Sequence, residues 1–336
     1  MPGRAADADS VRSHTAPYPA FGEIKRLDPA LDALIAPDAR MEALATGFTW
    51  SEGPTWHPRE DCLLFSDVPE NTVYRWREGR GIDVFLHPSG FTGAVYNGRE
   101  SGSNGLAVDA EGRLVLCQHG DRRVARLNPD GKTFTTVADR WEGKRFNSPN
   151  DLVIARGGAI FFTDPPYGLS PDTPREIAHH GVYRIDPDGS VHLITAELER
   201  PNGIALSPDE RTLYVTNSHR PRPYIFAIAL DASGNPVSEP YVLFDTRPFL
   251  IEGRNGLDGL AIDIHGNLWT TAPGGVFVIT PDGRHLGSLL TGRSTANCTF
   301  GGPDGSQLYI TADDTLVRLQ TRTRGLAFSR QSGGKE

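Results

Sequence analysis

The stretch PNGIALSPDERTLYVTN, residues 201–217, contains two short apolar segments separated by a polar turn. The first apolar segment follows an Asn, and the second ends on another Asn. The turn between them, SPDE, contains Pro, which fixes one φ angle, and Asp, which accepts local backbone hydrogen bonds. The stretch therefore predicts two β-strands joined by a turn, with a polar side chain at the start of the first strand.

The same plan occurs six times along the chain, in segments 51–67, 103–119, 149–164, 201–217, 257–272 and 296–312. A third strand with its own turn often follows, as in VYRIDPDGS, and a fourth follows in places, as in VHLITAE. Four strands per unit, repeated six times at intervals of roughly 40–55 residues, are typical of a β-propeller. The sequence predicts an all-β, six-bladed β-propeller with four-stranded antiparallel blades.

The two ends of the chain are expected to lie outside this repeat. We expect residues 1–40 to form an N-terminal tail with a short helix around PALDALIAPDARME, residues 41–325 to form the propeller, and residues 326–336 to form a C-terminal tail. A propeller ring usually closes by pairing a strand from one terminus with strands from the other. A strand near MEALATG, or one next to it, is expected to complete the last blade in this way.

Composition excludes several classes of protein. The chain of 336 residues has a formal net charge of −8 and no long basic run, so nucleic acid is not an expected partner. No apolar stretch of about 18 residues occurs, so no membrane span is expected. The N-terminus has no signal-peptide pattern, so a cytoplasmic location is expected, or a periplasmic one if a leader has been removed. The three Cys form no CxxC pair and are expected to be free, buried thiols.

The residue before the innermost strand of each blade is expected at the mouth of the central channel, where the six blades converge. These residues are Glu52, Asn104, Asn150, Asn202, Asp258 and Asn297. Asn-Gly and Asp-Gly are also favoured turn pairs, so a turn role is the alternative for each residue taken singly. However, Glu52 does not fit turn chemistry, and Asp rather than Gly follows Asn150.

The donor set of this ring is carboxylate and carboxamide oxygen, without Cys or His. Calcium prefers such oxygen ligands, whereas zinc favours His or Cys. The two carboxylates supply a charge of −2, which balances one divalent ion. We therefore expect one divalent metal ion, with calcium favoured and magnesium, manganese and zinc as alternatives.

The motifs SEGPTW, SPNDLV, RPNGIALSPDE and LDGLAID together resemble the gluconolactonase family, which includes senescence marker protein (regucalcin) and luciferin-regenerating enzyme. FTWSEGP and FTDPPYGL especially resemble bacterial gluconolactonases. The resemblance covers roughly residues 40–320 and implies a six-bladed propeller with one catalytic metal ion in its channel. It implies Glu52, Asn150, Asn202 and Asp258 as the metal ligands, and Asp258 also as the general base.

The resemblance implies hydrolysis of a sugar lactone, such as D-glucono-1,5-lactone, to its aldonic acid, D-gluconate. A lactone carbonyl becomes negatively charged as it turns tetrahedral, and a metal ion can stabilise that charge as a Lewis acid. Asp258 would accept a proton from the attacking water. A carboxylate held by a dication has a depressed pKa, so the alternative role for Asp258 is to orient the water.

Five further residues are expected to contact the substrate: Asn104, His119, Arg145, Asp164 and Tyr167. His119 and Asp164 end second strands near the channel mouth, and Tyr167 offers an aromatic face to a sugar ring. Arg145 lies near the place of an Arg that contacts substrate in some members of the resembled family. Two long irregular segments, 87–105 and 165–181, are expected to be binding loops, with flexible surface loops as the alternative.

Two other functions compete with the sugar lactonase. One is an organophosphate or aryl-ester hydrolase built on the same metal ring, and the other is a non-catalytic calcium-binding or docking scaffold. A GxSxG nucleophile elbow, a phosphate-binding GxxxxGK[ST] loop and a dinucleotide-binding fingerprint are all absent from the sequence. Serine hydrolases and nucleotide enzymes are therefore disfavoured.

Overall fold

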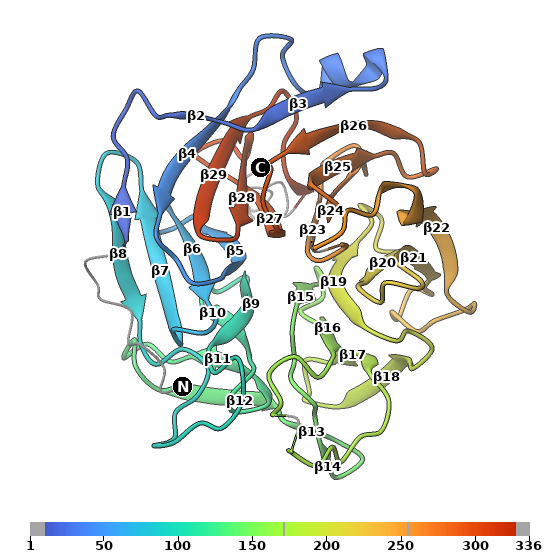
Figure 1. Ribbon diagram of the computed structural model, residues 1–336. Helices are drawn as coiled ribbons and strands as arrows, with labels where there is room; N and C mark the ends of the chain where they lie inside the picture. Colours follow the sequence, from blue (N-terminus) through green and yellow to red (C-terminus); the bar gives the residue numbers. More distant parts are fainter. Residues whose placement is uncertain (1–10, 171, 254–255, 327–336) are drawn as a thin grey trace.

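The computed structural model describes residues 11–170, 172–253 and 256–326. Six antiparallel sheets are arranged as blades around a central channel, as Figure 1 shows in a view along the axis. In five blades the four strands follow one another in the chain, from the channel outwards, whereas the sixth blade takes its outermost strand from the N-terminal part of the chain. The predicted six-bladed β-propeller with four-stranded blades is confirmed.

Blade 1 contains β5 (Ser51–His57), β6 (Cys62–Asp67), β7 (Thr72–Arg77) and β8 (Gly81–Leu86). Blade 2 contains β9 (Ser103–Val108), β10 (Leu114–Gln118), β11 (Arg123–Leu127) and β12 (Phe134–Ala138), and the small hairpin β13 (Arg140–Trp141) and β14 (Lys144–Arg145) follows it. Blade 3 contains β15 (Leu152–Ile154), β16 (Ile160–Asp164), β17 (Gly181–Ile185) and β18 (Val191–Thr195). Blade 4 contains β19 (Pro201–Leu206), β20 (Thr212–Asn217), β21 (Tyr224–Ala229) and β22 (Tyr241–Asp245), followed by the 3₁₀ turn η3 (Arg247–Phe249).

The last two blades also take up strands from the N-terminal part of the chain. Blade 5 contains β23 (Leu260–Ile262), β24 (Leu268–Ala272), β25 (Gly275–Ile279) and β26 (His285–Leu290), with β3 (Glu23–Arg26) as a fifth strand. Blade 6 contains β27 (Thr295–Gly301), β28 (Gln307–Ala312), β29 (Thr315–Gln320) and β4 (Met41–Thr46). Two short strands, β1 (Arg12–Ser13) and β2 (Ala20–Phe21), pair with β4.

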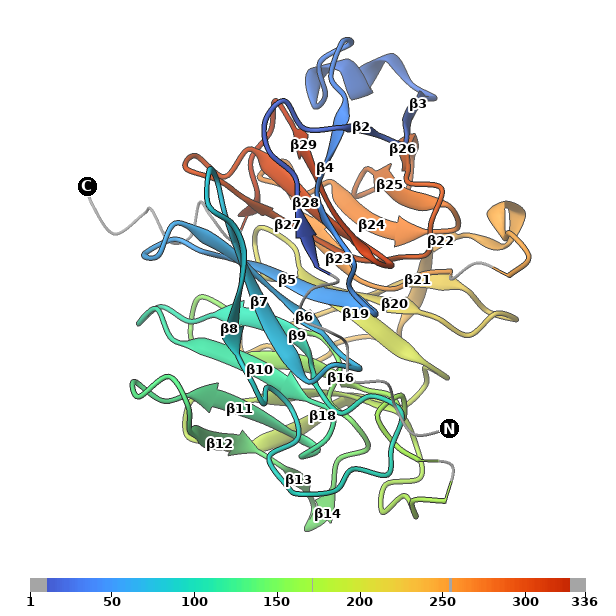
Figure 2. The same ribbon diagram turned by 60° about the vertical axis from the view of Figure 1, so that its left-hand side comes forward.

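The ring closes through β4, the strand expected near MEALATG. It pairs antiparallel with β29, with Thr46 opposite Thr315 and Ala43 opposite Val317 (Figure 2). The expected short helix is a 3₁₀ helix, η2 (Pro29–Ala33), capped by Asp28. The segment between Pro29 and Pro37 leaves room for only about two turns, which is too short for a stable α-helix. Of the expected C-terminal tail, only Leu326 belongs to the described residues.

Each pair of neighbouring blades encloses its own apolar cluster, so the core is divided into six wedges. In some of these wedges, aromatic side chains from the two neighbouring blades pack against each other. Trp56 of blade 1 stacks on Tyr309 of blade 6 with ring centroids 5.7 Å apart, and Trp269 of blade 5 meets Phe300 of blade 6 edge to face at 5.4 Å. Buried apolar surface of this kind holds the blades in fixed positions around the channel.

The Asn-Gly and Asp-Gly pairs at the channel are not turns. The backbone of Gly105, Gly203 and Gly259 is outside the left-handed region, so a turn conformation does not explain these glycines. An added Cβ would lie 2.7 Å from the carbonyl oxygen of Asn150 at Gly105, and 2.3 Å from that of Asp258 at Gly203. Glycine is required there because the next blade approaches the backbone closely.

A side-chain hydroxyl at an equivalent position links three of the blades to the next blade by a hydrogen bond. In three blades, a Ser or Thr one residue before the end of the second strand donates to the carbonyl of the channel residue in the next blade. The bonds are Ser66 Oγ to Asn104 O at 2.9 Å, Thr163 Oγ1 to Asn202 O at 2.6 Å and Thr216 Oγ1 to Asp258 O at 2.5 Å. These bonds set the position of the channel residues relative to one another.

Replacing Thr216 with Val is expected to lower the free energy of unfolding by about 1–2 kcal/mol, because the isosteric side chain removes this hydroxyl. Thr299→Val is the matched control, since the Thr299 hydroxyl makes only a 3.5 Å bond to the carbonyl of Phe300. Denaturant unfolding measures both variants. Equal stability of the two variants would show that the inter-blade hydroxyl does not contribute.

Candidate metal centre and active site

Three Asn side chains from three blades form a continuous hydrogen-bonded chain around the channel. Asn104 Nδ2 donates to Asn150 Oδ1 at 3.1 Å, and Asn150 Nδ2 donates to Asn202 Oδ1 at 2.7 Å. Asn202 Nδ2 then donates to Ser218 Oγ at 2.9 Å. The structure therefore brings together three residues that are separated by about fifty positions each in the sequence.

Two buried carboxylates face the same space from other blades. Glu52, in β5, is 2% exposed, and Asp258, just before β23, is 8% exposed. Burial raises the pKa of Glu52 to about 8, and the nearby charges of Asp151 and Glu100 add to the rise. Burial raises the pKa of Asp258 well above its usual value, with Glu52 the largest charged contributor. Glu52 is therefore close enough to Asp258 for its charge to raise the pKa of Asp258.

Asp151 is a third buried carboxylate, which was not among the residues expected at the site. Asn297 Nδ2 of blade 6 lies 3.5 Å from Asp151 Oδ2 of blade 3, so this contact spans the channel. Burial raises the pKa of Asp151 to about 7. One feature of the sequence could have identified Asp151: it directly follows Asn150, whereas Gly follows Asn104 and Asn202.

The ring fits a hard cation. The Oδ1 atoms of Asn104 and Asp258 are buried and have no hydrogen-bond partner. Such unpaired buried oxygens are costly, and a cation would satisfy them. In the described part of the chain, no three His, Cys, Asp or Glu side chains are grouped to hold a metal ion. The available donors are instead a mixture of carboxylate and carboxamide oxygens, which suits calcium.

His119 joins this ring to the long loop between β8 and β9. Its Nε2 lies 3.1 Å from Asn150 Oδ1, and its Nδ1 lies 3.0 Å from Glu100 Oε2. Glu100 lies on this irregular loop and has no equivalent position in the repeat, so the repeat does not predict it. This loop is fastened to the loop after β16, since the Tyr96 hydroxyl donates to the carbonyls of Glu100 and Gly168.

Asp164 is placed behind the ring rather than in it. Its buried Oδ2 accepts a hydrogen bond from the Asn147 main-chain nitrogen at 2.7 Å, so it holds the segment that leads to Asn150. In the same way, the Asp67 carboxylate accepts hydrogen bonds from the main-chain nitrogens of Thr49 and Trp50, shortly before Glu52. A direct contact of Asp164 with substrate stays a prediction.

Arg145 and Tyr167 occupy different surroundings. Arg145 Nη2 donates to the carbonyl of Asp121, which does not belong to the ring. Tyr167 lies beside the ring: its hydroxyl is buried, and burial together with the charge of Asp258 raises its pKa to about 12. The structure thus brings Tyr167, but not Arg145, next to a channel carboxylate.

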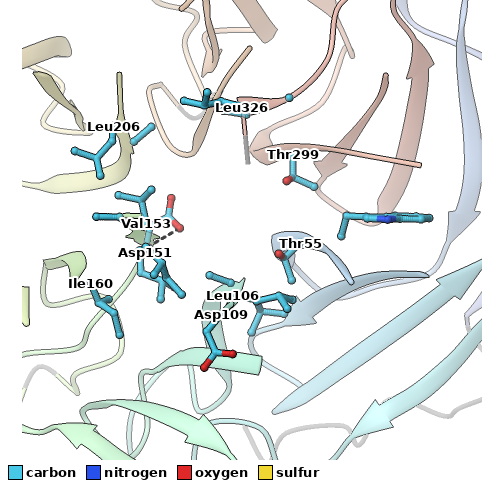
Figure 3. Close-up of a pocket in the computed structure, with 18 of the residues that line it drawn as sticks. Thr55, Leu106, Asp109, Asp151, Val153, Ile160, Leu206, Thr299 and Leu326 are labelled. Carbon is cyan, nitrogen blue, oxygen red and sulfur yellow. Dashed lines mark hydrogen bonds between the residues drawn. The ribbon is translucent and has the colours of Figure 1, made fainter. Parts of the chain in front are cut away.

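On the other side of the ring the channel widens into a cavity of about 800 Å³. Figure 3 shows Asp151 within it, with Leu106, Val153, Leu206, Thr55 and Thr299 around the open space. The inner strands run from the ring along this cavity. The ring of polar side chains therefore separates a mouth covered by loops from a more apolar chamber.

These features assign the chain to one structural class, the closed six-bladed β-propellers with buried carboxylate and carboxamide side chains at the channel. Residues 50–314 match the family model described as the SMP-30/Gluconolactonase/LRE-like region. The chain belongs to this family.

The relatives include several proteins named as lactonases. The chain is 41% identical over 313 residues to a gluconolactonase of Zymomonas mobilis, a match that covers 91% of this chain and 88% of that one. It is 26% identical over 264 residues to a pentonolactonase of Haloferax volcanii, covering 77% and 80% of the two chains. A solved structure from Xanthomonas campestris, described as a gluconolactonase, is 36% identical with a TM-score of 0.79, covering 92% and 98%.

Proposed function

We propose that this chain is a metal-dependent lactone hydrolase that converts sugar lactones, such as D-glucono-1,5-lactone, to aldonic acids at the central-channel ring. The observation that carries this proposal is the hydrogen-bonded chain of Asn104, Asn150 and Asn202 from three blades, with the buried carboxylate of Asp258 beside Asn202. The relatives named gluconolactonase and pentonolactonase support the substrate class. A purely structural scaffold would not need several buried carboxylates in one channel, because burying them destabilises the fold.

Glu52, Asn150, Asn202 and Asp258 would hold one divalent cation, and calcium is favoured because all four side chains offer oxygen. When bound, this ion supplies Lewis-acid polarisation of the lactone carbonyl. The unpaired Oδ1 of Asn104 borders the same space and is available to a cation or to a substrate hydroxyl.

Asp258 is the proposed general base. Its carboxylate would accept a proton from water as the water oxygen attacks the carbonyl carbon. The ring C–O bond then breaks, and the released ring oxygen takes up a proton, which gives the aldonic acid. The buried hydroxyl of Tyr167 lies beside the ring, where it can bind an oxygen atom of the substrate. Both nitrogens of His119 are engaged, with Asn150 and with Glu100, so His119 would act by positioning Asn150.

The proposal is tested by following acid release from D-glucono-1,5-lactone at constant pH, with and without a chelator. We expect a rate well above spontaneous hydrolysis, loss of that rate on chelation, and its return with added Ca²⁺. Rates equal to the spontaneous one would contradict the proposal and favour the scaffold alternative. Faster turnover of an aryl ester or organophosphate than of any lactone would favour the other hydrolase.

Metal affinity is expected to rise with pH. Glu52 has its pKa raised from 4.5 to about 8, so between these values the folded protein holds a proton that a bound cation must displace. We expect the Kd for Ca²⁺ to fall about tenfold or more between pH 6 and pH 8. Isothermal titration of chelator-treated protein at the two pH values measures this, and a Kd independent of pH would contradict it.

The same raised pKa predicts how metal-free stability depends on pH. The folded state binds the Glu52 proton more tightly than the unfolded chain does, so this contribution to stability is present at low pH and is lost as pH rises from 4.5 to about 8. The gain in Tm on adding Ca²⁺ should therefore be larger at pH 8 than at pH 5.5.

A further inference from the structure

Arg200 lies at the channel mouth, two residues before the ring residue Asn202. Its main chain is fixed on both sides, because its nitrogen donates to Asn217 Oδ1 at 2.8 Å and its carbonyl accepts from Ser218 N at 2.9 Å. Pro201 follows and restricts the backbone further. The side chain is exposed, yet it projects from a fixed point next to the ring.

The guanidinium of Arg200 lies over the ring of Tyr167, with its central carbon 5.9 Å from the ring centroid. Tyr167 is the residue whose buried hydroxyl lies near Asp258 and Ser218. One wall of the mouth therefore runs from the proposed base, through the phenol, to the guanidinium. The cation–π contact orients this guanidinium, which would otherwise be mobile on an exposed side chain.

This guanidinium carries no ion pair with a carboxylate of the described residues. The adjacent carboxylate, Glu199, is already engaged: its Oε1 accepts from Arg222 at 2.7 Å and its Oε2 from Asn217 at 2.9 Å. Two nearby arginines are paired with carboxylates, Arg222 with Glu199 and Arg247 with Asp245. Arg200 thus presents a planar set of N–H donors for which the described residues provide no acceptor.

We infer that Arg200, held over Tyr167, is a subsite for the hydroxyl groups of a polyhydroxylated lactone, and thereby a specificity-determining residue. This inference rests on the proposed function. A lactone whose carbonyl lies near Asp258 extends its remaining ring atoms along the wall of the mouth. Neighbouring hydroxyl oxygens of a sugar are acceptors spaced to meet two N–H groups of one guanidinium.

The test compares two lactones with the same six-membered ring, D-glucono-1,5-lactone and δ-valerolactone, which has no hydroxyl groups. The variants are Arg200→Met, Arg200→Lys and the control Arg247→Met. Arg247 is a suitable control because it also lies over a tyrosine, Tyr224 at 5.2 Å, but its guanidinium is paired with Asp245. KM and kcat are measured separately for each substrate.

Arg200→Met is expected to raise KM for gluconolactone about tenfold while kcat changes less than about twofold, because uniform binding is lost. Its kcat/KM for δ-valerolactone should stay at the wild-type value, Arg200→Lys should be intermediate, and Arg247→Met should match wild type. An equal loss on both lactones, or an unchanged KM for gluconolactone, would overturn the inference while leaving the proposed function intact. Absence of lactone hydrolysis by the wild-type protein would instead remove the proposed function, and the inference with it.

Discussion

Replacing Glu52 with Gln is expected to reduce kcat/KM for D-glucono-1,5-lactone by about 10³-fold or more, while the protein stays folded. Gln keeps the size of the side chain but removes one of the two carboxylates proposed to balance the cation. Asp258→Asn is expected to have an effect at least as large, because it also removes the proposed base. Initial rates at saturating Ca²⁺ measure the loss.

The stability of the Glu52 variant separates a functional loss from a folding defect. Because burial and neighbouring carboxylates raise the pKa of Glu52, its ionisation destabilises the metal-free fold at pH 8. The metal-free Glu52→Gln protein should therefore be at least as stable as wild type at that pH. Glu239→Gln, on an exposed loop, is the control and should change neither property. More than about a tenth of the activity remaining in Glu52→Gln would contradict the role proposed for Glu52.

Replacing Gly259 with Ala is expected to lower the free energy of unfolding by about 3 kcal/mol or more and to abolish activity. An added Cβ would lie 1.9 Å from Cγ of Asn297, at the point where blades 5 and 6 meet. Relief of this overlap must move either the strand that follows Asp258 or the side chain of Asn297. Both lie in the ring, so damage to the fold and damage to the site are coupled here.

Gly157→Ala provides the matched control for this effect. Gly157 has ordinary backbone angles and no atom within 4 Å of an added Cβ. Its replacement should change stability by no more than about 0.5 kcal/mol. Denaturant unfolding and lactone hydrolysis are measured on both variants. A Gly259→Ala protein as stable and active as Gly157→Ala would show that the blades tolerate separation at this contact.

The fold could be predicted because the same strand–turn–strand pattern occurs six times in the sequence. Six copies of the strand–turn–strand plan gave the number of blades, and the strand near MEALATG was needed to close the ring. The same repeat led to the channel residues, three of which form one hydrogen-bonded chain. The sequence left open whether Asn-Gly pairs such as Asn202-Gly203 were turns, and the answer depends on the approach of the next blade.

Other parts of the site could not be found by repeat position. Glu100 lies on an irregular loop, and its place beside His119 depends on the contact of Tyr96 with Gly168. Asp151 is adjacent to a repeat position, but its contact with Asn297 crosses the full channel. The contact of Tyr96 with Gly168 joins positions 72 residues apart, and that of Asp151 with Asn297 joins positions 146 residues apart. One sequence contains no periodic signal for either contact.

A crystal structure of the protein grown with Ca²⁺, with the ion located by its anomalous scattering, tests the proposed metal centre directly. We predict one ion on the channel axis, with oxygen atoms of Glu52, Asn150, Asn202 and Asp258 at about 2.3–2.6 Å. An ion bound elsewhere, or a channel without an ion in protein that hydrolyses lactones under the same conditions, would contradict it.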